Sequence, residues 1–142
     1  MDPILSYRDL RVWKVGMDIA ERVYRLTKSF PRDELFGITS QLRRAAVSIP
    51  ANIAEGYGRD SQGGYIQYLK VAQGSLKELE THLMLSARVD LAAENAVTPL
   101  LELCDHEGKM LATLITKVRA STVREDITEG YDAAPTDIQP YE

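Results

Sequence analysis

Apolar and small residues dominate residues 41–59, which read QLRRAAVSIPANIAEGYGR. Between Ala45 and Gly58 the only charged residue is Glu55. At helical spacing, the stretch forms a narrow polar stripe, an apolar stripe beside it, and a further face of mostly small residues. The polar stripe comprises Ser48, Asn52, Glu55 and Arg59; the apolar stripe comprises Leu42, Ala45, Ile49, Ile53 and Gly56; the small-residue face comprises Val47, Ala51, Ala54 and Gly58.

This pattern is typical of a buried helix, because the helix is apolar or small nearly all round. A lone up-down bundle leaves each helix an outer, solvated face, and residues 41–59 lack one. A second surface must therefore cover this helix, and the economical cover is another copy of the same chain. We predict a homo-oligomer in which the small-residue face makes the contact between copies.

The apolar spacing is helical along the rest of the chain as well, and no convincing strand alternation interrupts it. It predicts a first helix over about 9–29, with Ser6 or Asp9 as its N-cap. The second helix firms up after residues 37–39 and ends near 58–59; the third covers about 62–89. Pro50 predicts a kink or local distortion inside the second helix. The fourth starts around Thr98 and Pro99, or a turn earlier, and its period stops after Ala120.

Four amphipathic helices joined by short connections predict an all-α fold, an antiparallel up-down four-helix bundle. The charged residues are distributed unevenly along the chain. The net charge is −4, and residues 121–142 hold six acidic residues and one arginine, whereas residues 1–120 hold 16 basic and 15 acidic residues. We expect residues 1–120 to form the bundle and residues 121–142 to be an acidic tail that is disordered or loosely docked.

Composition also limits the location and the cysteine chemistry. No apolar run approaches the roughly 20 residues that a membrane span needs, and the first residues lack the pattern of a signal peptide. We therefore expect a cytoplasmic protein that does not enter a membrane. Cys104 is the single cysteine, so it can form neither an internal disulfide nor a thiolate metal site. Cys104 lies on the apolar stripe of the fourth helix, the seam that packs against the other helices. At this position it is most simply a small core side chain.

Two long segments carry a resemblance to a known family. They are residues 41–59 and the stretch Tyr68–Ala87, YLKVAQGSLKELETHLMLSA; the opening DLRVWKVGMDIAERVYRLTKSFP fits the same pattern. Between about Tyr7 and Val118, the chain resembles the "four helix bundle protein" family. Its members include proteins encoded in intervening sequences of bacterial large-subunit ribosomal RNA genes. The accessory variability determinant of diversity-generating retroelements is similar to this family.

The resemblance implies an antiparallel four-helix bundle that assembles into a ring, commonly a homopentamer, with no enzymatic activity or cofactor. The retroelement relative is implicated in binding nucleic acid and a reverse transcriptase. It is strongly basic, whereas this chain is nearly neutral with an acidic tail. The leading hypothesis is a non-enzymatic, ring-forming helical scaffold that binds a partner protein or ribonucleoprotein. The alternative is a nucleic-acid-binding accessory protein that binds RNA or DNA, alone or together with a reverse transcriptase.

Polar residues on the second and third helices raise an enzymatic alternative. The third helix supplies Ser75, Glu78 and His82 opposite the polar stripe, and two glutamates, a histidine and a serine would suffice for acid–base chemistry in a cleft. Polar groups on the border of two buried helices more often satisfy one another and fix the register. We predict a structural network with no catalytic residue, formed by Ser48, Asn52, Glu55, Arg59, Ser75 and Glu78. Asn52 and Glu55 should be buried or nearly so, with Glu55 paired to a cation such as Arg59.

A metal site has weaker support in the sequence. Glu78 and His82, like Glu102 and His106, repeat the spacing Glu-x-x-x-His. Carboxylate-bridged di-iron bundles use Glu-x-x-His instead. His106 also lies far round the fourth helix from its apolar seam, so we expect it to face solvent. The sequence therefore predicts no metal site.

Basic residues on the first two helices are the best candidates for nucleic-acid contact. These are Arg11, Lys14, Arg22 and Arg25 on the first helix and Arg43 and Arg44 on the second. Repeated around a ring, they would sum to a positive belt. Asp18 and Glu21 interrupt the arc, and a mixed charged face is usually solvated surface.

Overall fold

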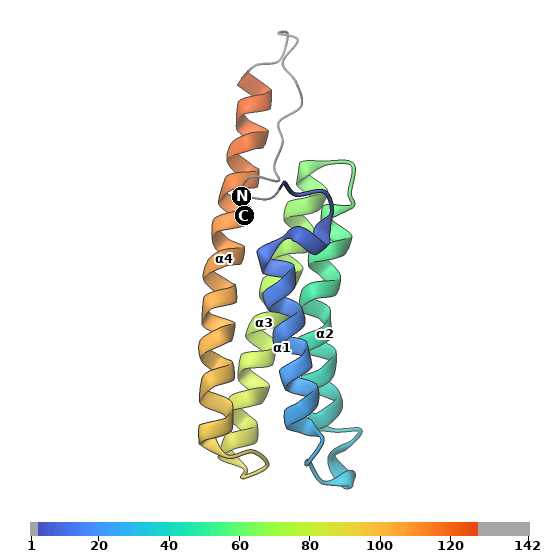
Figure 1. Cartoon of the computed structure of the whole chain (residues 1–142), viewed down its shortest axis with the longest axis vertical. Helices are drawn as coiled ribbons and strands as arrows, with labels where there is room; N and C mark the ends of the chain where they lie inside the picture. The colour runs from blue at the N-terminus through green and yellow to red at the C-terminus, as the bar shows by residue number, and fades with distance from the viewer. Residues whose placement is uncertain (1–2, 128–142) are drawn as a thin grey trace.

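The computed structural model describes the backbone of residues 3–127 and the side chains of residues 3–121. This part of the chain contains four α-helices, two short 3₁₀ helices and no strand. The α-helices run alternately up and down beside one another (Figure 1), which confirms the predicted four-helix bundle. Their bounds are α1, Arg11–Thr27; α2, Ile38–Tyr57; α3, Gln62–Arg88; and α4, Glu94–Ile127, with η1, Tyr7–Asp9, and η2, Arg32–Glu34.

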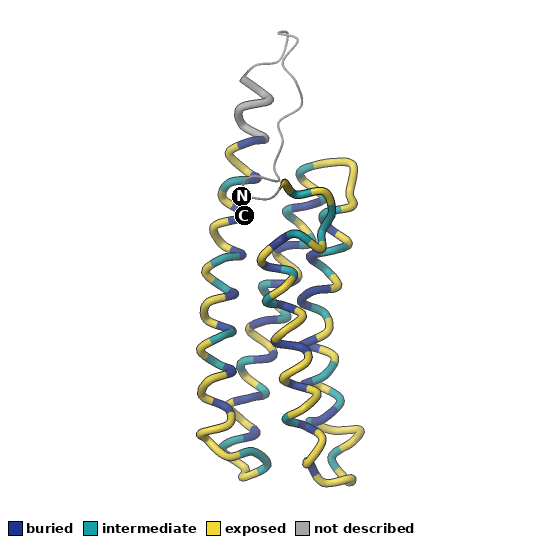
Figure 2. Tube along the Cα trace, viewed as in Figure 1, coloured by how far each residue is buried: buried dark blue, intermediate teal, exposed yellow. Residues whose placement is uncertain are grey.

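The core lies where the four apolar stripes meet. Each helix packs on its neighbours in chain order, and α1 also packs on α4, which closes the bundle. Figure 2 shows the buried positions repeating along each helix on the side that faces the others. Burying a side chain such as leucine or isoleucine contributes about 1.5–3 kcal/mol. The largest buried side chains include Ile19, Leu42, Ile49, Ile53, Leu69, Leu76, Leu79, Leu83, Leu111 and Leu114.

The N-terminal capping residues cap the short helix η1, which precedes the long helix α1. Ser6 Oγ accepts the Arg8 N–H at 3.2 Å, and the Asp9 carboxylate accepts the N–H groups of Leu5 and Ser6 at 2.9 and 3.1 Å. These bonds form a capping box on η1. The two backbone donors lower the pKa of Asp9 below its ordinary value. Helix α1 begins after this turn, with Leu10 at its N-cap position and no side-chain cap.

Helix α2 continues unbroken through Pro50, so the predicted distortion does not end the helix. Pro50 is buried and packs beside Gly16 of α1, where a Cβ atom added to Gly16 would lie 3.4 Å from Pro50 Cβ. A second close approach joins α2 to α3. A Cβ atom added to Gly56 would lie 2.6 Å from Tyr68 Cβ and 3.2 Å from the Tyr65 carbonyl oxygen. Because glycine has no side chain, Gly16 allows α1 to lie close to α2, and Gly56 allows α2 to lie close to α3.

Helix α4 starts at Glu94, the earlier of the two predicted starts, so Pro99 lies inside the helix and the alternative that placed it at the first helical position is wrong. The turn before Pro99 packs on the core through buried Val97, and this burial offsets the hydrogen bond that proline lacks. The expected end at Ala120 is also wrong, because Ser121 is buried and the helix continues to Ile127. The remaining residues of the predicted acidic tail lie outside the described part of the chain.

Candidate functional site

Three of the predicted polar residues come together between α2 and α3. Ser48 Oγ lies 2.7 Å from Ser75 Oγ. Asn52 Nδ2 donates to the Ser48 carbonyl oxygen at 2.7 Å and to Ser48 Oγ at 2.9 Å. All three side chains are half-buried. The cluster links the middle of the two helices, and its hydroxyl and amide groups bind one another.

Glu55 and Arg59 form a separate pair at the upper end of α2. Arg59 Nη2 lies 3.2 Å from Glu55 Oε1, its guanidinium lies 4.5 Å from the centre of the Tyr68 ring, and it also contacts the Tyr68 hydroxyl. The Glu55 side chain is 56% exposed. The pairing with Arg59 is as expected, but the predicted burial of Glu55 is wrong for the single chain, because no other helix of the bundle covers this side of α2.

Glu78 and His82 lie further along α3 and pair only with each other among the described side chains, at 3.4 Å. Glu78 is exposed, so the two glutamates and the histidine do not surround one cleft. Within residues 3–121, no group of three His, Cys, Asp or Glu side chains could hold a metal ion. His106 is exposed on α4, as expected. Cys104 is fully buried, and burial raises the pKa of its thiol to about 12.

The small-residue face of α2 lies at the surface of the single chain. Val47 is 43% exposed, Ala51 and Gly58 are exposed, and Ala54 is half-buried. The opposite side of the same helix is wholly buried. The helix is therefore covered on its inner side by α1 and α3 and left open along an outer strip that carries no large polar side chain from Val47 to Ala54.

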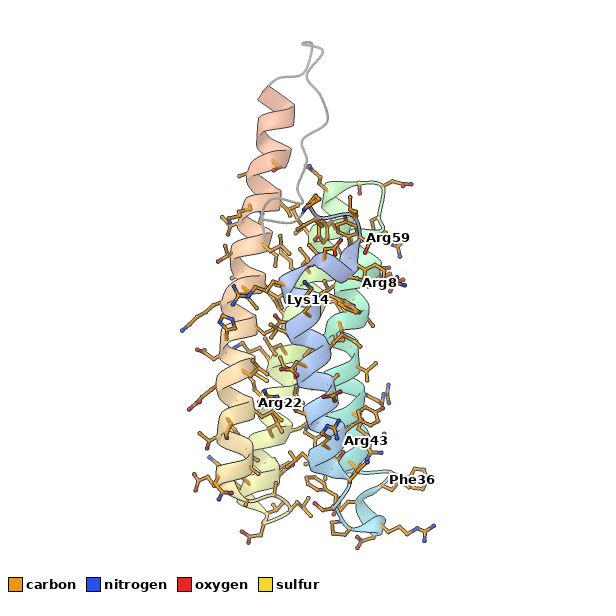
Figure 3. All side chains as sticks on the ribbon, in the orientation of Figure 1. Arg8, Lys14, Arg22, Phe36, Arg43 and Arg59 are labelled. Atoms are coloured by element: carbon orange, nitrogen blue, oxygen red, sulfur yellow. The ribbon has the colours of Figure 1, made fainter. Side chains whose placement is uncertain are left out.

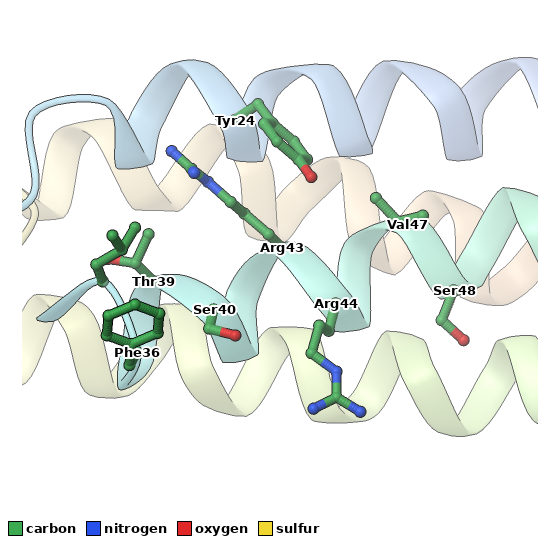
Figure 4. A pocket seen from close by; sticks show the side chains of 9 residues that line it. Tyr24, Phe36, Thr39, Ser40, Arg43, Arg44, Val47 and Ser48 are labelled. Atoms are coloured by element: carbon green, nitrogen blue, oxygen red, sulfur yellow. The ribbon is translucent and has the colours of Figure 1, made fainter.

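A groove of about 590 Å³ runs along the lower half of this outer side (Figure 4). Arg43 forms one wall: its Nε donates to Thr27 Oγ1 at 2.9 Å, and its guanidinium lies 4.8 Å from the centre of the Tyr24 ring. Arg44 points away from Arg43 on the other side of the helix. Phe36, 93% exposed, stands at one end. We call this the arginine groove; it is lined by Tyr24, Leu35, Phe36, Thr39, Ser40, Arg43, Arg44, Val47 and Ser48.

The predicted basic residues do not form one uninterrupted patch. Arg11, Lys14 and Arg44 are exposed. Arg22 pairs with Asp18 at 3.5 Å and Arg25 pairs with Glu21 at 3.7 Å, so acidic neighbours offset half of the arc on α1. Figure 3 shows Lys14 and Arg22 spaced along α1, with Arg43 lower down near Phe36. Arg43 does not project freely, because it packs on Tyr24 and binds Thr27.

The sequence interpretation missed one fully buried acidic residue, Glu107 of α4. Its Oε2 atom would lie 3.1 Å from a Cβ atom added to Gly16 of α1, so the glycine leaves room for the carboxylate. A signal was present in the sequence. Glu107 lies three residues after Cys104 and four before Leu111, which is the spacing of the buried seam. Phe36 was also missed, because it lies in a short loop outside any periodic pattern.

Comparisons with known proteins give a family and a fold. A solved structure from Bacteroides thetaiotaomicron, described as a protein with unknown function from the S23 ribosomal protein family, is 25% identical. The similarity covers 73% of this chain and 97% of that one, with a TM-score of 0.69. No functionally curated protein matches the sequence. The family model described as 23S rRNA-intervening sequence protein matches residues 8–113, and the chain therefore belongs to that family.

Proposed function

We propose that this protein is a non-enzymatic helical scaffold that assembles through the outer side of α2 and binds a partner protein or ribonucleoprotein. The uncovered apolar surface of α1 and α2 carries this proposal. Met17 and Tyr24 on α1 are 46% and 44% exposed, and Val47 and Ala51 continue the surface onto α2. A large contiguous apolar patch on the surface of a soluble protein usually marks a site that binds another molecule.

A closed ring, commonly of five copies, is the assembly that the family resemblance implies. Contacts between unlike surfaces close into rings when the rotation between neighbours returns to the start. The α1 part and the α2 part of this surface adjoin but differ in their side chains, so the α1 part of one copy can pack on the α2 part of the next, which is a contact between unlike surfaces. The half-buried hydrogen bonds among Ser48, Asn52 and Ser75 support a structural role for the polar network, because they hold α2 in register on α3.

Replacing Ala51 by glutamate tests the assembly surface. The variant should fold but remain monomeric, because the added carboxylate would be buried without a partner where two copies meet. Ala112→Glu, on an exposed position of α4, is the matched control and should keep the mass of the wild type. Light scattering gives the mass, and circular dichroism checks the fold. An Ala51→Glu variant with the wild-type mass would contradict the proposed surface.

The names of the relatives indicate where to look for a partner. The matching family is described by the 23S rRNA intervening sequence, and the solved relative by a ribosomal protein family. We expect affinity purification from the native cell to recover a ribonucleoprotein. Nuclease treatment separates the two kinds of partner: a protein bound directly is retained, and one bound through RNA is lost. Recovery of no specific partner with the wild type would contradict the scaffold role.

Nucleic-acid binding is the second candidate, and the arginine groove is the observation that favours it. Arginines beside exposed aromatic rings can bind phosphates and stack on bases of single strands. Binding of this kind must weaken steeply as salt rises, because counterions are released from the phosphates. Arg44→Ala should weaken binding of a single-stranded RNA, whereas the distant Arg88→Ala should not. Affinity that does not change with salt would argue against this candidate.

A further inference from the structure

Charged residues mark both ends of the apolar strip on the outer side of α2. Arg44 lies one turn before Val47, and Glu55 lies one turn after Ala51. This spacing puts the four residues on one face of the helix, and all four are exposed. We call them the α2 stripe. From the lower end of α2 to its upper end (Figure 1), the stripe is positive, apolar, apolar and negative.

A second stripe of exposed residues runs along α1. Its members, at the same helical spacing, are Lys14, Met17, Glu21 and Tyr24. They line an open hollow of about 580 Å³ together with Val15, Asp18 and Ala20. In this α1 stripe the positive residue lies toward the upper end of the bundle and the negative residue toward the lower end. The order of charge is therefore the reverse of that in the α2 stripe.

The two stripes also match in height along the bundle. Helices α1 and α2 run antiparallel, and a Cβ atom added to Gly16 of α1 would lie 3.4 Å from Ile49 Cγ2 of α2. Glu21 and Arg44 each lie five residues below this contact, so they lie at the same height. Within one chain Arg44 points toward the α3 side (Figure 4), and no described carboxylate forms an ion pair with it.

Assembly through the outer side of α2 covers Arg44. A covered charge without a partner is costly, so the covering surface must supply a carboxylate at the height of Arg44. Glu21 of a second copy meets this requirement when both copies stand the same way up. Its ion pair with Arg25 of its own chain spans 3.7 Å between side chains that are 69% and 63% exposed. Such exposed pairs contribute little, so Glu21 can exchange this partner for Arg44.

We propose that the α1 stripe of one copy packs along the α2 stripe of the next copy, with all copies the same way up. Glu21 of one copy pairs with Arg44 of the next. Lys14 pairs with Glu55, whose height differs from that of Lys14 by about one helical turn, a distance that the two long side chains span. Met17 packs on the apolar middle of the α2 stripe. Each contact repeats in the same sense around the assembly, as a ring requires.

This contact rests on the proposed assembly and specifies the surface that covers α2. Because it covers Arg44, it excludes the RNA binding by Arg44 that the second candidate function requires. A two-fold contact of α2 on α2 is the competing arrangement, since it also brings Arg44 of one copy to Glu55 of the other. That arrangement leaves Met17 and Tyr24 uncovered, although they are 46% and 44% exposed on the single chain.

Charge reversals that keep the net charge of the chain distinguish the two arrangements. One variant reverses the α1 stripe with Lys14→Glu and Glu21→Lys. A second variant reverses the α2 stripe with Arg44→Glu and Glu55→Arg. Each variant alone places like charges opposite one another in the proposed contact, so light scattering should give the 15.9 kDa of a single chain where the wild type is assembled. The protein with all four substitutions should regain the wild-type mass.

Asp105→Lys with Lys109→Asp is the matched control, because it reverses an exposed ion pair on α4 and should leave the mass unchanged. Circular dichroism checks that each variant is folded. An α1 variant with the wild-type mass, or a folded four-substitution protein that stays monomeric, would overturn the proposed contact. An α2 variant that assembles on its own would overturn it in favour of the two-fold contact. A monomeric wild type would contradict the assembly itself, whereas these other outcomes in an assembled protein contradict only the contact.

Discussion

The two sides of α2 both lack charged residues between Ala45 and Ala54, and they are opposite in burial. On the inner side, Leu42, Ile49 and Ile53 are fully buried against the rest of the bundle. On the outer side, Val47 and Ala51 are exposed, although neither side carries a charged residue between Ala45 and Ala54. The comparison teaches that an apolar pattern predicts that a face will be covered, but it does not name the element that covers it. Helices α1 and α3 of the same chain cover the inner side. We propose that a second copy of the chain covers the outer side.

The two sides should therefore respond differently to substitution. Changes on the inner side act within one chain and lower its stability at every protein concentration. Changes on the outer side act between chains, so they alter assembly and the part of the stability that depends on concentration. The following substitutions separate these effects, and they are arranged from the largest expected loss of stability to the smallest.

Ile53→Ala should cause the largest loss. It removes a fully buried side chain from the inner side of α2, and such truncations cost about 2–5 kcal/mol. Urea unfolding measures the change in the free energy of unfolding. Val47→Ala is the matched control on the outer side and should cost less, with a loss that shrinks on dilution. Equal, concentration-independent losses in the two variants would contradict the difference between the sides.

Gly56→Ala should cost about 1–3 kcal/mol, because the added Cβ atom would lie 2.6 Å from Tyr68 Cβ and force α2 and α3 apart. Gly74→Ala is a matched control on α3, where an added Cβ atom meets nothing within 4 Å. The control should stabilise the protein by about 0.5–1 kcal/mol, since alanine is the better helix former. Thermal unfolding followed by circular dichroism compares the two. A Gly56→Ala protein as stable as Gly74→Ala would show that the helices do not approach as described.

Ser75→Ala should cost about 1 kcal/mol, because it removes the 2.7 Å hydrogen bond to Ser48 at the border between the two sides. Ser48 keeps its hydrogen bond from Asn52 in this variant, which limits the loss. Ser29→Ala, at an exposed position after α1, should change the stability by less than about 0.5 kcal/mol. Chemical unfolding measures both. If the two variants lost equal stability, the cluster would have no role in joining the helices.

Glu55→Ala should have the smallest effect, below about 1 kcal/mol, because exposed ion pairs contribute little. The sequence interpretation expected a buried carboxylate and a loss of a few kcal/mol, and the 56% exposure of the side chain reverses that expectation. Glu55→Gln should behave in the same way as Glu55→Ala. A loss of several kcal/mol in a monomeric background would mean that Glu55 is buried after all; a large loss only in the assembled protein would place it in the contact between copies.

The order and type of the helices could be predicted from the sequence, because prolines and glycines separate long stretches with one clear helical period. The sequence left two starts open for α4, and it did not predict the C-terminal end. Packing of Val97 on the core decides for the earlier start, and packing of Ser121 overrides the local signal of the acidic residues that follow Ala120. Tertiary contacts decide such ends, and a single sequence does not display them.

The polar residues show the same limit. The period of α2 placed Ser48 and Asn52 beside α3, and the structure has them bonded to Ser75 and to each other. The helical period alone could not distinguish a helix face that is covered by its own chain from one that is covered by a second copy. For this reason Glu55 was expected to be buried. Glu107 was overlooked for the converse reason: a carboxylate at a seam position is buried because Gly16 on α1 leaves space for it.

The mass of the full-length protein in solution tests the central claim most directly. The outer side of α2 should be covered by other copies, so light scattering at micromolar concentration should give a stable oligomer. For the ring of five that the family resemblance implies, the mass is about 80 kDa, five times the 15.9 kDa of one chain. A single species of 15.9 kDa across the micromolar range would show that the apolar outer side of α2 needs no cover from a second copy, and would contradict the account.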